Sequence, residues 1–303
     1  MRTTRRRTAR ARVARYLALG LTAAPALASA ATVELLPGDL PRTPDAYTAM
    51  SIQYGHADLR GPYRDGETDH SRQATGRDVQ LSLTHAGSLG EFPYLVAASL
   101  SHVRQSVRVT PVPGLTIRQR VSGMDDLRLA AGFWPWRSED GRTNWQSGLV
   151  VSLPTGQYRA GRPLNPGENR YRYTLVNAFN HRFDSGLTFD AFFLYNIYED
   201  NDRDGDGRSV GRRDDTQSLT AYLSYRTSLA TQVFVGTEFV RGDSHYLDEF
   251  ETFEGQRDVR GYVGGHLYTS RRDRLSLRLG KTLAIDSGND NHFQLVLKWG
   301  HRF

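Results

Sequence analysis

The stretch Phe293–Phe303, FQLVLKWGHRF, decides the fold. Every second residue from Phe293 is apolar or aromatic, apart from His301, and the residues between them are mostly polar. Side chains of a β-strand point alternately to opposite faces, so this stretch predicts a strand with one apolar and one polar face. Two classes of fold use such a strand, the soluble β-sandwich and the transmembrane β-barrel.

Eleven further stretches of the chain alternate in the same way. In 187–197, for example, Leu, Phe, Ala, Phe, Tyr and Ile occupy every second position. No long pattern with helical periodicity occurs after residue 30. The eleven stretches are 48–54, 79–83, 94–100, 127–133, 145–153, 171–179, 187–197, 219–225, 233–239, 259–267 and 275–285.

The connections between these stretches alternate between long and short, except for the last, 286–291. A barrel with both termini in the periplasm has short periplasmic turns and long external loops, whereas a soluble sandwich has no reason to sort its loops by parity. We therefore expect an all-β fold, a transmembrane antiparallel barrel of about twelve strands (range 10–14) over 46–303. The long connections are 57–77, 102–125, 154–169, 199–215 and 241–257, and the short ones 86–92, 136–143, 184–186, 226–231 and 270–273.

The N-terminus has the composition of an export signal. Residues 1–30 contain seven arginines and no acidic residue, then the apolar run 16–27 and the small-residue site Ala28-Ser29-Ala30. This order predicts a signal peptide over 1–30, followed by an irregular segment over 31–45, and a basic arm for nucleic acid is disfavoured. Without those arginines, 32 basic residues stand against 33 acidic ones, so no nucleic-acid partner is expected. The chain has no cysteine, so its stability cannot come from disulfides.

The polar faces of the strands are expected to line the lumen. Charged side chains there either select solutes at a constriction or form a paired network that stiffens the barrel, since a buried charge is costly unless it is paired or hydrated. The lumen-lining candidates are Arg128, Arg172, Asp190, Glu238, Arg260, Arg278 and Lys298.

Two stretches were weighed as chemical sites. Asp200, Asp202 and Asp204 stand at positions 1, 3 and 5 of a calcium-loop pattern, but position 12 is Gly211 rather than Glu, so they are weak metal candidates beside a simple solvated loop. Ser101-His102 and His181 are expected at opposite ends of the barrel and cannot form a nucleophile–base pair. We expect no catalytic site and no cofactor, and a hydrolase is the third-ranked function.

Several stretches carry resemblances. The terminal strand, with Trp299 and Phe303, resembles the C-terminal signal that the barrel-assembly machinery of Gram-negative bacteria reads. Leu40-Pro41, 123–127 (GMDDL), 130–136 (AAGFWPW), 153–158 (LPTGQY) and 165–170 (NPGENR) together resemble the outer-membrane family of the MetA pathway of phenol degradation. That family usually has a second glycine where this chain has Asp125.

The resemblance runs from about residue 40 to the end of the chain. It implies an outer-membrane channel or transporter for small molecules, with aromatic and other apolar compounds as candidate solutes. The alternative is a closed barrel with a structural or surface-interaction role. Outer-membrane lipid and lipopolysaccharide are the expected partners besides the solute. The loop after Leu153 could fold inward over the mouth, and the apolar residues of 102–125 could form strand extensions, so that the two make a partly apolar vestibule.

Overall fold

The computed structural model describes residues 33–40, 46–64, 66–112, 114–162, 164–204 and 209–303. The expected signal peptide and most of the irregular segment that follows it lie outside these ranges. Among the described residues there is no helix long and apolar enough to cross a membrane.

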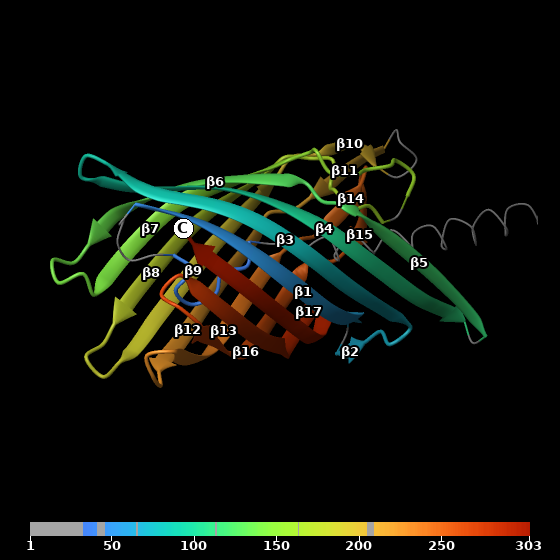
Figure 1. Cartoon of the computed structure of the whole chain (residues 1–303). Helices are drawn as coiled ribbons and strands as arrows, with labels where there is room; N and C mark the ends of the chain where they lie inside the picture. The colour runs from blue at the N-terminus through green and yellow to red at the C-terminus, as the bar shows by residue number, and fades with distance from the viewer. Residues whose placement is uncertain (1–32, 41–45, 65, 113, 163, 205–208) are drawn as a thin grey trace, which may run out of the picture.

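Eleven strand elements close into one antiparallel ring (Figure 1). Each pairs with its neighbours in the chain, and β17 also pairs with β1, so no strand edge of the ring stays open. Closure satisfies every backbone hydrogen bond in a wall that faces lipid. The elements are β1 (Tyr47–Arg64), β3 (Arg72–Leu89), β4 (Phe92–Val112), β6 (Leu127–Arg137), β7 (Thr143–Leu153), β8 (Arg172–Arg182), β9 (Leu187–Tyr198), β12 (Thr216–Arg226), β13 (Thr231–Gly242), β16 (Gln256–Tyr268) and β17 (Asp273–Arg302).

The long β17 contributes twice to the wall. Its first half pairs with β16 and its second half pairs with β1, both antiparallel. The Arg302 amide donates to the Arg272 carbonyl at 2.9 Å, so the two ends of β17 lie side by side and the chain must reverse within it. Gly288, with φ of 99°, provides a backbone conformation that suits this reversal. The two halves correspond to the stretches 275–285 and 293–303, and the predicted barrel of about twelve strands is confirmed.

The alternating apolar residues point outward, as predicted. Along β9 the burial alternates almost residue by residue, and Phe193 is 40% exposed whereas Phe192 is 2% exposed. The same outward belt continues around the barrel in Leu81, Leu219 and Leu297. These side chains are exposed because lipid, rather than protein, is their solvent.

The long connections contain more strand than the sequence predicted. Region 102–125 is a hairpin of β4 and β5 (Leu115–Met124) that extends past the end of the ring, as its apolar residues suggested. Regions 199–215 and 241–257, expected as loops, pair with each other as a small second sheet. Its strands are β10 (Asn201–Asp204), β11 (Ser209–Arg213), β14 (His245–Leu247) and β15 (Phe250–Phe253), and the two-residue β2 (Glu67–Thr68) pairs with β1. Hairpins beyond the membrane satisfy their backbone N–H and C=O groups by pairing with each other. Their side chains need not alternate between lipid and lumen, so a search for alternating apolar residues does not find them.

Candidate functional site: the lumen and its inward loop

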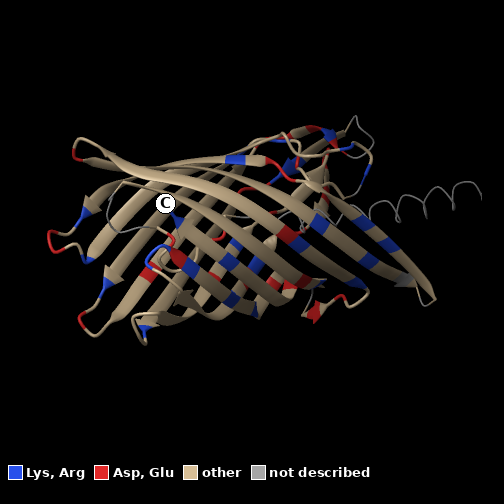
Figure 2. Ribbon diagram, in the orientation of Figure 1, with Lys and Arg blue, Asp and Glu red and all other residues tan. Residues whose placement is uncertain are grey.

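The seven predicted lumen residues all lie on the inner face of the wall. Arg128, Arg172, Asp190 and Arg278 are each 4% exposed. The side chains of Glu238, Arg260 and Lys298 are 17%, 20% and 18% exposed. Figure 2 shows charged positions along the strands of the wall as well as in the turns.

Each of these seven side chains has a polar partner. Arg128 pairs with Asp125 at 2.6 Å, Arg260 with Glu238 at 3.3 Å, and Asp190 accepts from Asn180 at 2.6 Å. Arg172 pairs with Glu168 at 3.3 Å. Such pairing offsets the cost of removing charges from water. The arrangement is that of a paired network rather than of a ring of free charges.

Residues 33–40 lie inside the barrel and meet this network, which the sequence did not predict. Glu34 pairs with Arg278 at 3.1 Å and accepts from Gln294 at 2.7 Å. Asp39 pairs with Lys298 at 2.8 Å and also with Arg274. Two acidic residues in an irregular segment are thus bound by cations of the two halves of β17.

The N-terminal segment also packs on an apolar part of the inner wall. Leu36 is fully buried. Val33, Leu35 and Leu40 pack against a cluster formed by one side of the barrel. From the sequence we expected the polar faces of the strands to line the lumen, and we did not predict this apolar cluster. It arises because inward positions on these strands carry apolar and aromatic residues: Val150, Val176, Ala178, Phe192, Leu194, Tyr222, Phe234 and Tyr262.

Within the described part of the chain, two cavities border the segment. The larger, of about 230 Å³, lies at the short-turn end beside Gly38, Asp39 and Lys298. The smaller, of about 60 Å³, lies between Glu34, Glu238 and Arg278, with Phe192 and Leu59 among its other lining residues. That volume admits a water or two but no aromatic solute. The N-terminal segment therefore occupies much of the lumen at the level of Glu34.

At the long-loop end, Asp126 joins the connection between β7 and β8 to the wall. Its carboxylate accepts the amide hydrogens of Gly156 at 2.8 Å and of Glu168 at 3.0 Å. The Gln157 amide donates to the Met124 carbonyl at 2.9 Å. A Cβ on Gly156 would lie 2.8 Å from the Asp125 carbonyl carbon, so this close approach requires glycine. The loop therefore folds inward, as its composition suggested.

Glu168 is the centre of an ionic cluster beneath that loop. It pairs with Arg172 at 3.3 Å and with Arg213 at 3.2 Å. Arg213 also pairs with Asp243, which lies 2.9 Å from His245. Burial raises the pKa of Glu168, but the guanidinium groups of Arg213, Arg172 and Arg170 outweigh it and bring the pKa down to about 2.

The weak calcium candidates do not form a site within the part of the chain that the structure describes. There, no group of three side chains is arranged to hold a metal ion. Asp200 and Asp202 are exposed, and Asp204 lies 4.0 Å from Arg170. Residues 205–208, which complete the loop, lie outside the described ranges, so calcium binding stays a prediction.

The serine and histidine pair that was considered for catalysis is separated along the barrel. His102 lies next to Ser122 on the hairpin side at 3.3 Å, and His181 lies next to Thr143 at the short-turn end at 2.8 Å. Ser101 is buried and donates to Gln80 at 3.4 Å, whereas His102 is exposed on the other face of β4.

Comparison with known proteins identifies the family. The sequence model of the family described as "Putative MetA-pathway of phenol degradation" matches residues 73–301. The chain belongs to this phenol-degradation family. No curated protein sequence matches it significantly.

Solved structures similar to this family member are outer-membrane barrels. An outer membrane channel from Pseudomonas putida F1 has a TM-score of 0.81 at 23% identity, covering 89% of this chain and 100% of that one. The β domain of the Bordetella autotransporter BrkA has a TM-score of 0.58 at 10% identity, covering 86% of this chain and 100% of that one. A FadL homologue from Pseudomonas aeruginosa has a TM-score of 0.50 at 9% identity, covering 91% and 97%. The fold and its exposed apolar belt place this phenol-degradation family member in the bacterial outer membrane.

The motifs that resembled the family meet at one place in the fold. The runs 123–127, 153–158 and 165–170 come from three separate segments and interlock through Asp126. The departure at Asp125 is accommodated, because its amide donates to the Ser101 carbonyl at 2.9 Å and its side chain holds Arg128.

Proposed function

We propose that this barrel conducts small molecules across the outer membrane and that aromatic or other apolar compounds are its solutes. One observation carries the proposal. Residues 33–40 occupy the lumen through polar contacts to β17 and apolar contacts to the inward cluster of the other strands, so the occluding element is a separate segment rather than the wall itself. A segment held by exchangeable ion pairs can move without unfolding the ring.

The apolar inner cluster supports apolar solutes. The Tyr222 ring lies between two other aromatic rings. Its centroid is 6.2 Å from that of Phe192 and 5.5 Å from that of Phe234. When the N-terminal segment leaves, this surface faces the lumen. Aromatic pockets bind apolar ligands through buried area and stacking. We place the long loops outside and both termini of the chain in the periplasm, following the general rule for such barrels.

Single-channel conductance of the refolded protein in a planar bilayer tests this proposal. We expect the unmodified protein to be closed for most of the time. The double variant Glu34→Gln with Asp39→Asn weakens both anchors of the segment and should show longer or larger open steps. Glu139→Gln, in an exposed turn, is the matched control and should behave as the unmodified protein.

A lumen occupied by its own N-terminal segment also favours the second candidate, a barrel with a structural or surface-interaction role. If the double variant folds and stays silent, and cells with and without the protein accumulate a phenolic compound equally, the channel proposal is wrong and this role takes its place. Catalysis is not proposed.

A further inference from the structure

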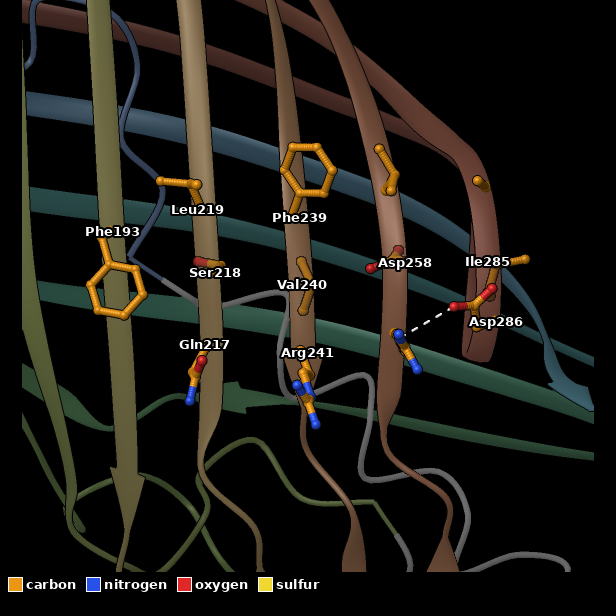
Figure 3. Close-up of a pocket in the computed structure, with 13 residues that line it drawn as sticks. Phe193, Gln217, Ser218, Leu219, Phe239, Val240, Arg241, Asp258, Ile285 and Asp286 are labelled. Carbon is orange, nitrogen blue, oxygen red and sulfur yellow. Dashed lines mark ion pairs between the residues drawn. The ribbon is translucent and has the colours of Figure 1, made fainter.

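A groove of about 380 Å³ lies on the outer wall toward the long-loop end (Figure 3). Strands β9, β12, β13, β16 and β17 contribute to it. It faces the membrane rather than the lumen and is separate from the lumen that residues 33–40 occupy. Near it the pairing of β16 with β17 changes register between Arg257 and Asp258 and again between Val259 and Arg260. Such bulges bend a sheet locally.

The groove has an apolar floor formed by one row of cross-strand neighbours. Phe193 pairs with Leu219, Leu219 with Phe239, and Phe239 with Val259. Phe193, Leu219 and Phe239 are 40%, 46% and 51% exposed, so they present a continuous apolar surface. Alkyl chains are the natural occupants of such a surface within a membrane.

A basic rim borders this floor on the long-loop side. Arg241 and Arg257 are two residues beyond Phe239 and Val259, which is about 7 Å along a strand. They are directly opposite each other in the pairing of β13 with β16, and both are exposed. Like charges in this position repel each other and destabilise the pair, unless an anion lies between them.

Two carboxylates line the groove. Asp258 is buried and pairs with Arg260 at 2.8 Å, so Asp286 is the one that neutralises part of the charge of the arginine pair. Asp286 lies 3.2 Å from Arg257, and both side chains are largely exposed, at 71% and 66%. Figure 3 shows Arg241 and Gln217 on neighbouring strands at the edge of the groove, away from Asp286. The rim thus keeps an excess of positive charge next to an apolar surface.

We propose that this groove binds lipid A, the lipid portion of lipopolysaccharide, with a phosphate between Arg241 and Arg257 and an acyl chain along Leu219 and Phe239. The long-loop end lies in the outer leaflet if the loops are external, and lipid A is the anionic lipid of that leaflet. Guanidinium groups suit phosphate because their planar fork donates two parallel hydrogen bonds. Free phosphate would bind the arginines of the rim but would make no contact with the apolar floor, so we expect it to bind more weakly than lipid A.

Native mass spectrometry of the refolded barrel in detergent tests the proposal. The probes are diphosphoryl lipid A, its monophosphoryl form, phosphatidylglycerol and inorganic phosphate. We expect the unmodified protein to retain diphosphoryl lipid A most strongly. Arg241→Gln with Arg257→Gln should weaken retention about tenfold or more, the equivalent of about 1.4 kcal/mol. Asp286→Asn removes the ion pair with Arg257 and should strengthen the retention of lipid A.

Arg137→Gln with Arg271→Gln is the matched control, because both arginines are exposed at the short-turn end. It should retain lipid A as the unmodified protein does. Equal retention by the groove variant, an equal loss in the control, or phosphatidylglycerol competing as well as lipid A would each overturn the proposal. Only protein that shows the heat-modifiable migration of a folded barrel is compared. Lipid retention does not depend on whether the barrel conducts, so this test is separate from that of the proposed function.

Discussion

Asp126 shows how a single carboxylate can fix an entire loop. It is 4% exposed and is bonded to two backbone amides, Gly156 N and Glu168 N, that lie at the two ends of the inward loop. A carboxylate has two acceptor oxygens and no donor, so it can bind both amides at once. Asparagine has the same shape but presents an NH₂ group in place of one oxygen.

Asp126→Asn should therefore release one end of the loop. An unsatisfied buried amide costs about 1–3 kcal/mol, and we expect a loss of stability in this range. Urea unfolding of the refolded barrel, followed by tryptophan fluorescence, measures it. Asp200→Asn removes an exposed carboxylate near the same end and is the control. If both variants unfold at the same urea concentration, Asp126 is not the anchor.

Glu168 makes the same loop sensitive to acid. Its pKa is lowered to about 2 in the folded protein, against an ordinary value of about 4.3. A lowered pKa stabilises the folded state above the ordinary value, and this contribution is lost as the pH falls from about 4.5 to about 2. Pepsin cleavage within 154–171 should rise over that range. In Glu168→Gln cleavage should vary much less with pH, and continued protection of the unmodified loop at pH 2 would contradict the assignment.

At the scale of elements, the β4–β5 hairpin and the inward loop support each other. Val107 and Val109 of β4 pack with Leu164 of the loop, and Val121 of β5 lies against this cluster. The predicted apolar vestibule has this contact as its physical basis. The ring itself does not need the hairpin, because residues 94–99 of β4 pair with β6 below it.

Deleting 106–119 should consequently leave the barrel folded but expose Leu164 and loosen the loop. We expect unchanged heat-modifiable migration together with altered uptake of a phenolic compound by intact cells. The matched control shortens the turn at 138–142, which lies at the opposite end. Unaltered uptake after the hairpin deletion would count against a vestibule.

The sequence predicted the elements that face lipid and missed those that face protein. A wall between lipid and lumen requires apolar and polar side chains to alternate, so the sequence predicts which residues of a stretch such as 187–197 face the lipid. Residues 33–40 obey no such constraint, because an irregular segment can satisfy Glu34 and Asp39 with any suitably placed cations. The sequence also did not predict the inward cluster that contains Phe192 and Tyr222. A single apolar residue on a face expected to be polar has no evident role until the segment that packs against it is known. The three motifs indicated a resemblance to a family, but only the fold shows that Asp126 joins them.

At the scale of the whole molecule, the barrel is complete only when its last strand meets its first. Ala49 pairs with Arg302, and the Phe303 amide donates to the Thr48 carbonyl at 2.9 Å. The Phe303 ring is 65% exposed and makes an edge contact with His301, with ring centroids 5.0 Å apart. The backbone of the terminal residue thus closes the seam, whereas its side chain contributes little to packing.

This division predicts different effects of Phe303→Ala in cells and in vitro. If the terminal aromatic ring is the signal for the assembly machinery, with Trp299 beside it in the same strand, the variant should reach the outer membrane in reduced amounts. Its refolding from urea into detergent should be nearly unchanged, because the amide of residue 303 still closes the seam. Phe183→Ala removes a similarly exposed ring, 45% accessible, from a turn at the same end and should assemble normally. Equal amounts of both variants in the membrane would show that the side chain of Phe303 is not read, and a shared refolding defect would mean that these rings stabilise the barrel instead.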